Sequence, residues 1–541
     1  MKTTYTPGVV FHPKSSRGLQ RGINQLVDAV RPTLGPRPRL VALTRVASTG
    51  APELLDNAGV IARRIIQLPD RDADMGAMFV RHMLWNQHER EGDGTATTAV
   101  LFQSLFNQGL HYLASDGNAM VLRRYLEEGL KVILDELACQ AVPVEGPQAL
   151  ARVAAAVCGD PPMARLLGEI FDIIGEYGRI EIRTGRGRDL EREYVEGIYW
   201  KGGAISRAMT ADKPHNRAEL QDPRILVSDL ELTQPEDVLP VLIAARQAGV
   251  RSLLLIARQF ADPVLATILV NNKPGEFDIL AVKTPGLTIA EIMGILEDMS
   301  FLTGARIFSK QGGERLDGIR AEDLGHARRA WADREFFGIV GAQGNPRALR
   351  QHIARLKEAH RVVGDLAERK NLRDRIGKLT GGAATLWIGG NTESEVNVRK
   401  ELAEHTIEAV RGALLAGVVP GGGTALLDCQ PALRARLKAA TESEERAAYR
   451  ILIRALEEPA RTIVGNAGFD VDEVLAQIRL AGRGHGFDVE AEQVVVMAAS
   501  GVLDGASALK AAVKLAVLSA GIALTTGVLV HHKKPVEATN P

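Results

Sequence analysis

The run from Gly92 to Thr98, GDGTATT, combines residue types that suit a magnesium nucleotide. Its two glycines let the backbone approach a ligand closely, its aspartate can hold a magnesium ion, and hydroxyl and amide groups at a helix start can bind phosphate oxygens. An ordinary helix N-terminus has the same composition, because Asp, Gly and Thr are frequent there. Taken alone, the run leaves both interpretations open.

Two further glycine loops stand beside predicted helices: TLGP at Thr33–Pro36 and GVVPGGGT at Gly417–Thr424. Each could present backbone amides to a phosphate or ribose, and each could equally be a turn. A P-loop ATPase is disfavoured, since no G-x-x-x-x-G-K-[ST] run occurs and Gly377-Lys378 is followed by Leu379. The three loops therefore matter as a set.

The bulk composition bounds the architecture and the partners. A chain of 541 residues is too long for one hydrophobic core and predicts several domains. Lys plus Arg and Asp plus Glu both number 66, so no global charge favours nucleic acid or an anionic membrane as a partner. Aromatic residues make up only 4%, which suits a helix-rich α/β architecture better than a base-stacking surface.

The cysteines and the apolar segments indicate the compartment. Cys139, Cys158 and Cys429 are odd in number and widely spaced, which is typical of a reduced compartment. The N-terminal residues lack the charged-then-apolar pattern of a secretory signal. The apolar stretch 515–530 is shorter than the roughly 18 residues of a membrane span, so we interpret it as a buried helix. We expect a cytoplasmic protein that neither spans nor contacts a membrane.

The elements that must position these loops fall into three blocks. Leu122, Leu126, Leu130, Ile133 and Leu137 form one stripe of a helix predicted over 118–141. Between about 224 and 309, strands at 225–227, 252–257, 278–283 and 305–309 alternate with helices that start at 235, 262 and 288, which predicts a parallel sheet covered by helices. A strand is predicted at 179–182 and a charged helix pair at 345–378. The sequence thus predicts a mixed α/β, mostly helical protein in which an α/β domain is inserted between helical ends.

The order and spacing of the three loops resemble those of the group I (GroEL-type) chaperonins, of which this chain is identified as a divergent member. The likeness runs from about Leu19 to Val530. It is carried by the following segments: Thr33–Pro36, Gly92–Thr95, Val195–Gly197, Leu379–Gly382, Gly417–Gly423 and Val502–Asp504.

The resemblance implies a chaperonin fold with three kinds of domain. Residues 12–140 and 417–532 would form a helical equatorial ATP-binding domain, and 141–195 and 383–416 a hinge-like intermediate domain. Residues 196–382 would form an α/β apical domain that binds clients, followed by a polar tail at 533–541. Hinges are expected at Pro143, Gly197, Gly381, Gly382 and Gly417, although each of these residues also suits an ordinary turn.

The resemblance also implies ATP and Mg²⁺ as cofactors, with K⁺ as a further candidate ion. Asp93 would ligate magnesium, the threonines after it would lie near the phosphates, and Asp504 would hold the ribose. Ala96 stands where the family commonly has another threonine. The expected nucleotide-binding residues are Thr33, Leu34, Gly35, Pro36, Gly92, Asp93, Gly94, Thr95, Thr97, Thr98, Gly421, Gly422, Asp488, Val502 and Asp504.

Two departures concern catalysis. His405 stands where the family has the aspartate that orients the attacking water, and Asn57 stands where it has a second aspartate. A histidine beside phosphates tends toward the cation, so it would stabilise bound nucleotide better than it would activate water. We therefore expect nucleotide binding with slow or negligible hydrolysis, and the sequence leaves open whether the chain is an ATPase. The alternative is that Asp56, Glu404 or a shifted alignment supplies the carboxylate.

The client surface is likewise inferred from the resemblance. The family holds exposed apolar segments of unfolded chains, and the mobile loop of a lid co-chaperonin, between two apical helices, and such an apolar groove needs no particular client sequence. By periodicity alone these side chains would face the apical sheet. Small residues such as Ala204 and Ala208, where the family has aromatics, predict weaker capture. The expected client-binding residues are Met209, Leu239, Leu242, Leu265, Leu269 and Val270.

The expected function is therefore that of an ATP-binding chaperonin subunit that captures unfolded polypeptides in a homo-oligomeric ring, by resemblance two stacked heptamers. One alternative is a nucleotide-binding scaffold, or one subunit type in a ring mixed with a paralogue. Another is an enzyme on the central sheet, but no G-x-G-x-x-G, G-x-S-x-G or H-E-x-x-H run supports it.

Overall fold

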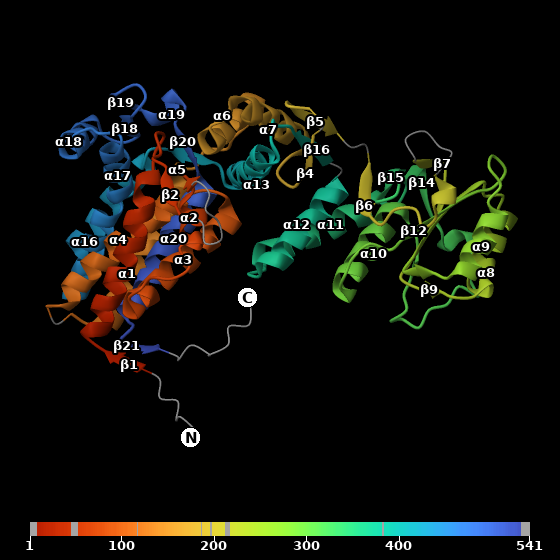
Figure 1. The fold of residues 1–541 in the computed structure, drawn as a ribbon, viewed down its shortest axis with the longest axis horizontal. Coiled ribbons are helices and arrows are strands. Elements are labelled where there is room, and N and C mark those ends of the chain that lie inside the picture. Colours follow the sequence, from red (N-terminus) through yellow and green to blue (C-terminus); the bar gives the residue numbers. More distant parts are fainter. Residues whose placement is uncertain are drawn as a thin grey trace, which may run out of the picture. The chain divides into compact units, whose positions relative to one another are not determined.

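The chain was analysed as a computed structural model that describes residues 8–44, 52–115, 117–185, 187–194, 197–210, 217–380 and 383–531. It divides into two compact units (Figure 1). Unit 1 comprises Met1–Asp172 and Gly390–Pro541, and unit 2 comprises Ile173–Gly389. Gly381, Gly382 and the tail at 533–541, for which a hinge and a polar end were expected, lie outside the described residues.

Unit 1 is mainly helical and contains short strands. Its helices are α1 (Lys14–Val30), η1 (Arg31–Thr33), α2 (Ala58–Arg64), α3 (Arg71–Glu91), α4 (Thr95–Leu113), α5 (Ala119–Gln140), α6 (Pro147–Cys158), α7 (Pro161–Ile174, whose last residues belong to unit 2), α13 (Glu393–Ala416), α14 (Thr424–Leu427), α15 (Gln430–Ala439), α16 (Ser443–Ala455), α17 (Glu458–Asn466), α18 (Val471–Ala481), α19 (Met497–Ser500) and α20 (Ala506–Leu524). Its strands are β1 (Gly8–Phe11), β2 (Val41–Leu43), β3 (Glu53–Leu55), β17 (Val418–Pro420), β18 (His485–Asp488), β19 (Gln493–Val496), β20 (Leu503–Gly505) and β21 (Val528–His531).

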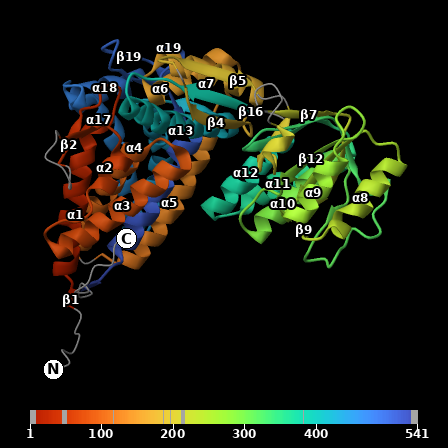
Figure 2. The same ribbon diagram turned by 45° about the vertical axis from the view of Figure 1, so that its right-hand side comes forward.

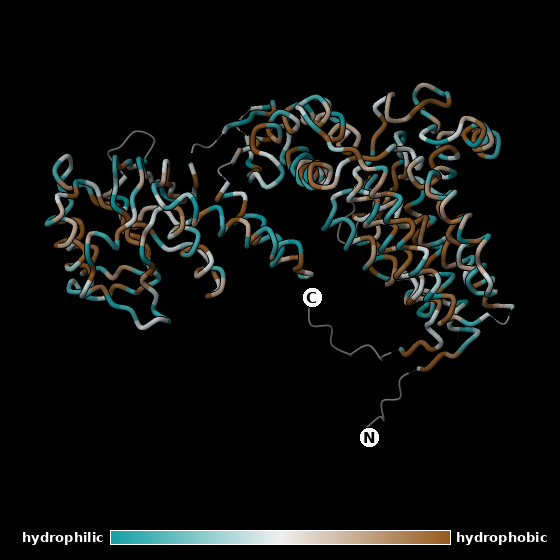
Figure 3. Tube along the Cα trace, turned by 180° about the vertical axis from the view of Figure 1, so that it is seen from behind, coloured by the Kyte–Doolittle hydropathy of each residue, from teal (hydrophilic) through white to brown (hydrophobic). Residues whose placement is uncertain are grey.

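A helical bundle forms the core of unit 1, in which α1, α3, α4, α5, α16 and α20 pack together (Figure 2). The helix predicted over 118–141 is confirmed as α5. Asn118 caps it through hydrogen bonds to the amides of Met120 and Val121, and its leucine stripe is buried. Hydrophobic and hydrophilic residues alternate along the helices of the bundle (Figure 3), and the apolar side chains of these helices form one buried cluster. The bundle is therefore a rigid support for the loops between its helices.

Both ends of the described chain contribute to this bundle. Strands β1 and β21 pair antiparallel, with Gly8 opposite His531, and the amide of His12 donates to the carbonyl of Gly527. Helices α1 and α3 approach so closely that a Cβ at Gly22 would collide with the carbonyl of Ala73. This close contact fixes α3, which ends at the loop around Asp93.

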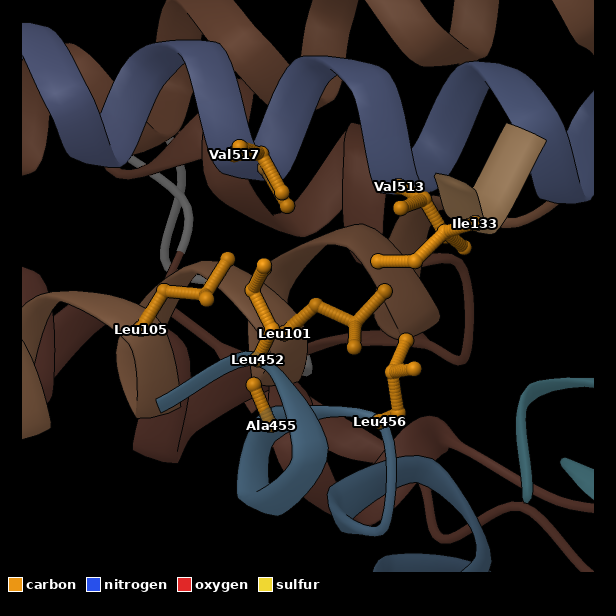
Figure 4. Close-up of a pocket in the computed structure, with 9 residues that line it drawn as sticks. Leu101, Leu105, Ile133, Leu452, Ala455, Leu456, Val513 and Val517 are labelled. Carbon is orange, nitrogen blue, oxygen red and sulfur yellow. The ribbon is translucent and has the colours of Figure 1, made fainter. Parts of the chain in front are cut away.

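Helix α20 contains most of the apolar stretch that was expected to be a buried helix. By length and composition it is the one described helix that could span a membrane, yet it packs against α3, α4 and α5 in the core of unit 1. A small cavity lies beside it, between α4, α5 and α16 (Figure 4). Its lining, which includes Leu101, Ile133, Leu452 and Val517, is wholly apolar and offers no polar anchor for a ligand.

Unit 2 contains the predicted α/β block. Its strands are β4 (Arg179–Thr184), β5 (Leu190–Tyr194), β6 (Ile198–Lys201), β7 (Ala218–Gln221), β8 (Arg224–Ser228), β9 (Glu231–Leu232), β10 (Ser252–Ala257), β11 (Gln259–Phe260), β12 (Asp278–Lys283), β13 (Ile307–Phe308), β14 (Gly325–Ala332), β15 (Phe336–Ala342) and β16 (Ala383–Ile388). Its helices are η2 (Arg207–Met209), α8 (Pro235–Gln247), α9 (Asp262–Asn271), α10 (Ile289–Thr303), η4 (Ala321–Asp323), α11 (Pro346–Val362) and α12 (Leu366–Thr380).

The parallel sheet is confirmed in β12, β10, β8 and β13, which pair parallel in that order. Antiparallel strands β14, β15, β7 and β6 extend it, so the sheet is mixed rather than purely parallel. Strands β10 and β12 are buried almost throughout, which explains their continuous apolar sequences. A separate sheet joins β4, β16 and β5. Helices α11 and α12 are the predicted charged pair.

The two units divide the segments expected to form the intermediate domain. Helices α6 and α13 pack together in unit 1, whereas strands β4, β5 and β16 belong to unit 2.

Lys378, in α12, permits a prediction about the stability of unit 2. Burial lowers the pKa of its ammonium group to about 8, the charge of Arg179 adds to this effect, and Asp374 opposes it. An unfolded lysine titrates near 10.4, so between these two values the unfolded chain binds more protons and stability rises with pH. Below pH 8 the full penalty of the buried charge remains.

We therefore expect Lys378→Met to stabilise unit 2 at pH 7 by about 2 kcal/mol, after allowance for the partial exposure of the side chain. The gain should shrink as the pH rises through 8 and vanish above about 10.4. Calorimetric melting at several pH values measures it, with Lys370→Met, at an exposed position of the same helix, as the control. If Lys378→Met stabilised unit 2 equally at all pH values, the stabilisation would not come from removal of the buried charge.

Candidate functional site

The loop 92–94 is held between three helices of unit 1. Helix α3 ends at Gly92 (φ +68°), and Gly94 (φ +77°) begins α4, so both positions need the left-handed conformation that glycine adopts easily. Gln87 donates from Nε2 to the carbonyl of Asp93 (2.8 Å) and to that of Ala508 at the start of α20 (3.1 Å). The loop is thereby fixed against the C-terminal half of the chain.

The N-terminus of α4 has unsatisfied amides. No described side chain caps it, whereas Asn57, Asp70 and Asn118 cap α2, α3 and α5. Thr95 and Thr98 are buried, Thr97 is half-buried, and the Thr98 hydroxyl donates to the carbonyl of Gly94 (2.8 Å). The free amides of the first turn, together with the helix dipole, suit an anion such as a phosphate.

Asp93 and Asp504 form a coupled pair of carboxylates. Burial raises the pKa of Asp93, and its Oδ1 accepts a hydrogen bond from the Gly94 amide (2.6 Å). Burial, and then the negative charge of Asp93, raise the pKa of Asp504 to about 7. Two carboxylates that repel each other in a partly desolvated site are relieved by a cation, and oxygen donors are the ligands that Mg²⁺ prefers. This donor set fits the expected magnesium ion.

The Gly-Gly-Gly loop lies directly beside Asp504. Strand β17 pairs with β20, which places Val419 opposite Asp504, and the amide of Gly421 donates to the carbonyl of Val502 (2.9 Å). A Cβ at Gly421 would lie 3.0 Å from Oδ1 of Asp504. The lack of a side chain at Gly421 therefore leaves the Asp504 carboxylate accessible from the loop.

Helix α17 brings the remaining loop to the same place. Gly423 lies against Ala460, and Gly35 (φ +117°) packs on Ile463, one turn further along this helix. The Nδ2 group of Asn466 donates to the carbonyls of Arg31 and Leu34. The Thr33 hydroxyl donates to the carbonyl of Val30. The structure thus brings together the four segments around Gly35, Asp93, Gly422 and Asp504.

Asp488 lies near this site, but its side chain makes hydrogen bonds within the β18–β19 hairpin. Its Oδ1 accepts from the amides of Glu490 and Ala491 in the turn between β18 and β19. The carbonyl of the preceding residue, Phe487, lies 3.9 Å from where a Cβ of Gly422 would be. The hairpin therefore borders the glycine loop, and a contact from Asp488 to a nucleotide stays a prediction.

His405, on α13, lies against the loop that precedes α4. A Cβ at Gly92 would collide with the carbonyl of His405, so only glycine permits this approach. Burial lowers the pKa of His405, while neighbouring Glu401 and Glu404 act in the opposite direction. Without bound phosphate the ring is therefore more readily neutral than an exposed histidine, which differs from the cation expected beside a nucleotide.

His88 connects the two departures from the family pattern, and sequence reasoning missed it. Its ring centroid lies 3.8 Å from that of His405, and Gly59 packs on its Cβ. Asn57, whose Oδ1 accepts from the amides of Gly59 and Val60, caps the helix that carries this glycine. The available signal was the position of His88 four residues before Gly92, one helical turn from the loop. Asp56 and Glu404 are exposed.

The residues expected to bind clients lie at different depths in unit 2. Val270 is 78% exposed, and Leu239, Leu265 and Leu269 are half-buried. Leu242 and Met209 are buried in the core of this unit and offer little surface. Ile243, which the sequence interpretation left out, is 52% exposed on α8, and α8 packs on α9. The exposed large apolar side chains of this helix pair are therefore Ile243 and Val270.

Comparison with known proteins places these features in a family. Two solved structures of the chaperonin gp146 from the bacteriophage EL 2 (Pseudomonas aeruginosa), both determined in the presence of ATP-BeFx, have a similar fold at 20% sequence identity. Crystal form I gives a TM-score of 0.72 over 97% of this chain and 99% of that one, and crystal form II gives 0.64 over 98% and 100%. The sequence profile of the TCP-1/cpn60 chaperonin family matches residues 26–269 and 278–534. This protein therefore belongs to the TCP-1/cpn60 chaperonin family, as the glycine loops and Asp504 had indicated.

Proposed function

We propose that this protein is an ATP-binding chaperonin subunit that captures unfolded polypeptides within an oligomeric ring. The observation that carries the proposal is that Asp93, Gly421 and Asp504, which are spread over most of the sequence, meet beside the N-terminus of α4. Gly35 packs on α17, the helix that also contacts this glycine loop. Chaperonins as a family bind ATP and form oligomeric rings that hold unfolded clients. The geometry of unit 1 supports the nucleotide-binding part of this role.

In this proposal the nucleotide phosphates lie at the first turn of α4 and Mg²⁺ lies at Asp93. Asp504 then faces the ribose from β20, and the two glycine loops on α17 form the walls. Magnesium would supply charge neutralisation for the phosphates. The chain itself contributes amides, two carboxylates and loops without side chains that let the backbone come close.

A second candidate function is a subunit that binds nucleotide but does not run the chaperonin cycle of ATP hydrolysis. His405 and Asn57 replace the two expected aspartates, and the ring of His88 lies against that of His405 at a tilted angle of 43°. Neither side chain provides a carboxylate that could orient water. This observation favours a subunit that binds nucleotide and hydrolyses it slowly, as a scaffold or within a ring whose other subunits hydrolyse ATP.

Electron microscopy of the purified protein with and without ATP, paired with a phosphate-release assay, separates these candidates. Rings that change with ATP and release phosphate support a complete chaperonin cycle, in stacked heptamers if the resemblance holds in detail. Rings with negligible release support the second candidate, and so does assembly that needs a paralogue. Absence of rings under all conditions would contradict both. We place the protein in the cytoplasm, and addition of a lid co-chaperonin to the same samples tests that partner.

The exposed side chains of α8 and α9 give a prediction for client capture. We expect Ile243→Ser combined with Val270→Ser to weaken capture of a denatured model protein by about 10-fold or more, because the apolar area that a client would cover is lost. The measurement is the concentration of rings that suppresses aggregation by half. Val362→Ser is the matched control, since this valine is 77% exposed on α11 of the same unit. An equal effect of the control would contradict a specific client surface.

A further inference from the structure

Three potential metal ligands meet beside the nucleotide loops. The ligand atoms of His88, Glu401 and His405 all lie within 4.8 Å of one another. Glu401 and His405 are four residues apart on α13 and so share one face of that helix, while His88 comes from α3. Two imidazoles and a carboxylate are a donor set that Zn²⁺ takes with its fourth position open.

The ring of His88 supplies a second, independent observation. His88 is 1% exposed, and its buried ring nitrogen Nδ1 has no hydrogen-bond partner within the part of the chain that the structure describes. A buried polar nitrogen without a partner is costly, so such a group is rarely left without a role. Its ring lies 3.8 Å, centroid to centroid, from the half-buried ring of His405, which places it at the inner side of the cluster.

The surrounding charges favour a cation at the His405 side. Glu89, Glu401, Glu404 and Glu408 all act on His405 with negative charge. Arg63, whose guanidinium lies 3.8 Å from the ring centroid of Trp85, acts on His88 with positive charge and opposes a metal there.

We propose that His88, Glu401 and His405 form a binding site for a transition-metal ion of the zinc type that ties α13 to α3. The ligand atoms already lie within 4.8 Å of one another. Binding at about 2.0–2.2 Å from one ion would bring them only slightly closer, so small side-chain rotations would close the site. Glu401 is exposed and free to turn toward His88. A bound ion would hold the carbonyl of His405 against Gly92 and would occupy the imidazole that replaces the water-orienting aspartate.

Metal binding is tested on the full chain, purified free of metal and without nucleotide. We expect calorimetric titration with Zn²⁺ to show one strong site per chain, and Co²⁺ to give the visible absorption of a low-coordinate site with nitrogen ligands. Glu401→Gln and His405→Asn should each weaken this site about 10–100-fold or more. His82→Ala is the control, since His82 is exposed on the same helix as His88 and lies outside the cluster.

The variants also separate this site from the nucleotide site. Asp93→Asn should leave Zn²⁺ binding unchanged, whatever it does to nucleotide binding. Because Glu401 is exposed, Glu401→Gln is expected to fold, and circular dichroism checks this. The proposal is overturned if the wild-type chain binds no Zn²⁺ strongly, or if Glu401→Gln and His405→Asn bind it as well as the wild type does.

Discussion

We expect replacement of His405 with aspartate to raise the rate of ATP hydrolysis by about 10²–10⁴-fold, the usual contribution of a positioned general base. The backbone of this position lies against Gly92, directly before the loop that carries Asp93, and in the proposed arrangement a carboxylate there would lie beside the γ-phosphate. A neutral or cationic imidazole cannot orient the attacking water in the same way. Phosphate release at saturating Mg-ATP measures the effect.

Two kinds of control accompany this experiment: the same new carboxylate at a distant position, and removal of neighbouring carboxylates. His82→Asp introduces the same carboxylate at an exposed site on α3 and should leave the rate unchanged. Asp56→Asn and Glu404→Gln in the wild-type background test whether a neighbouring residue already supplies the carboxylate. A wild-type rate as fast as that of His405→Asp refutes the interpretation, and loss of that rate in one of these variants identifies the group responsible.

We expect Asp93→Asn to weaken Mg-dependent nucleotide binding by about 100-fold, because loss of a ligand costs at least as much as loss of an outer-shell partner of a ligand, which is about 10–100-fold. Asparagine keeps the size of the side chain but removes the charge that would hold Mg²⁺ and that raises the pKa of Asp504. Titration of a fluorescent ATP analogue with and without Mg²⁺ measures the loss, which should be confined to the Mg²⁺-dependent part.

The matched control is Asp470→Asn, which removes a carboxylate that caps α18 through the amides of Asp472 and Glu473. It changes net charge by the same amount without touching the loops. If Asp93→Asn binds Mg-ATP as the wild type does, Asp93 is not the magnesium ligand, and the proposed site is wrong in its central element.

The sequence predicted the elements that have strong local signals. The stripe of α5, with its cap at Asn118, and the apolar runs of β8, β10 and β12 are such signals, because periodicity and capping act over a few residues. The arrangement that brings the Gly35 loop to the glycine loop beside Asp504 has no such local signal. It depends on α17 and on the pairing of β17 with β20, which no local pattern contains, and only the resemblance to a family indicated it.

Other features could not be predicted because they are set by packing. The role of His88 depends on how α3 and α13 meet, since its contact with His405 joins residues more than three hundred positions apart. The burial of Leu242 and the exposure of Ile243, adjacent in sequence, depend on the face that α8 turns to its sheet. Pro240 inside that helix further weakens any estimate from periodicity.

The packing of the N-terminal helices of unit 1 against α20 has a consequence for biosynthesis. The N-terminal helices of unit 1 bury apolar surface against α20, which leaves the ribosome only after all of residues 173–389 have been made. Residues 141–505 separate α5 from α20, and at about 5–20 residues per second their synthesis takes on the order of 20–70 s. Throughout that interval the leucines of α5 lack the α20 surface that they later bury against, so the nascent chain carries an unburied apolar stripe during its own synthesis.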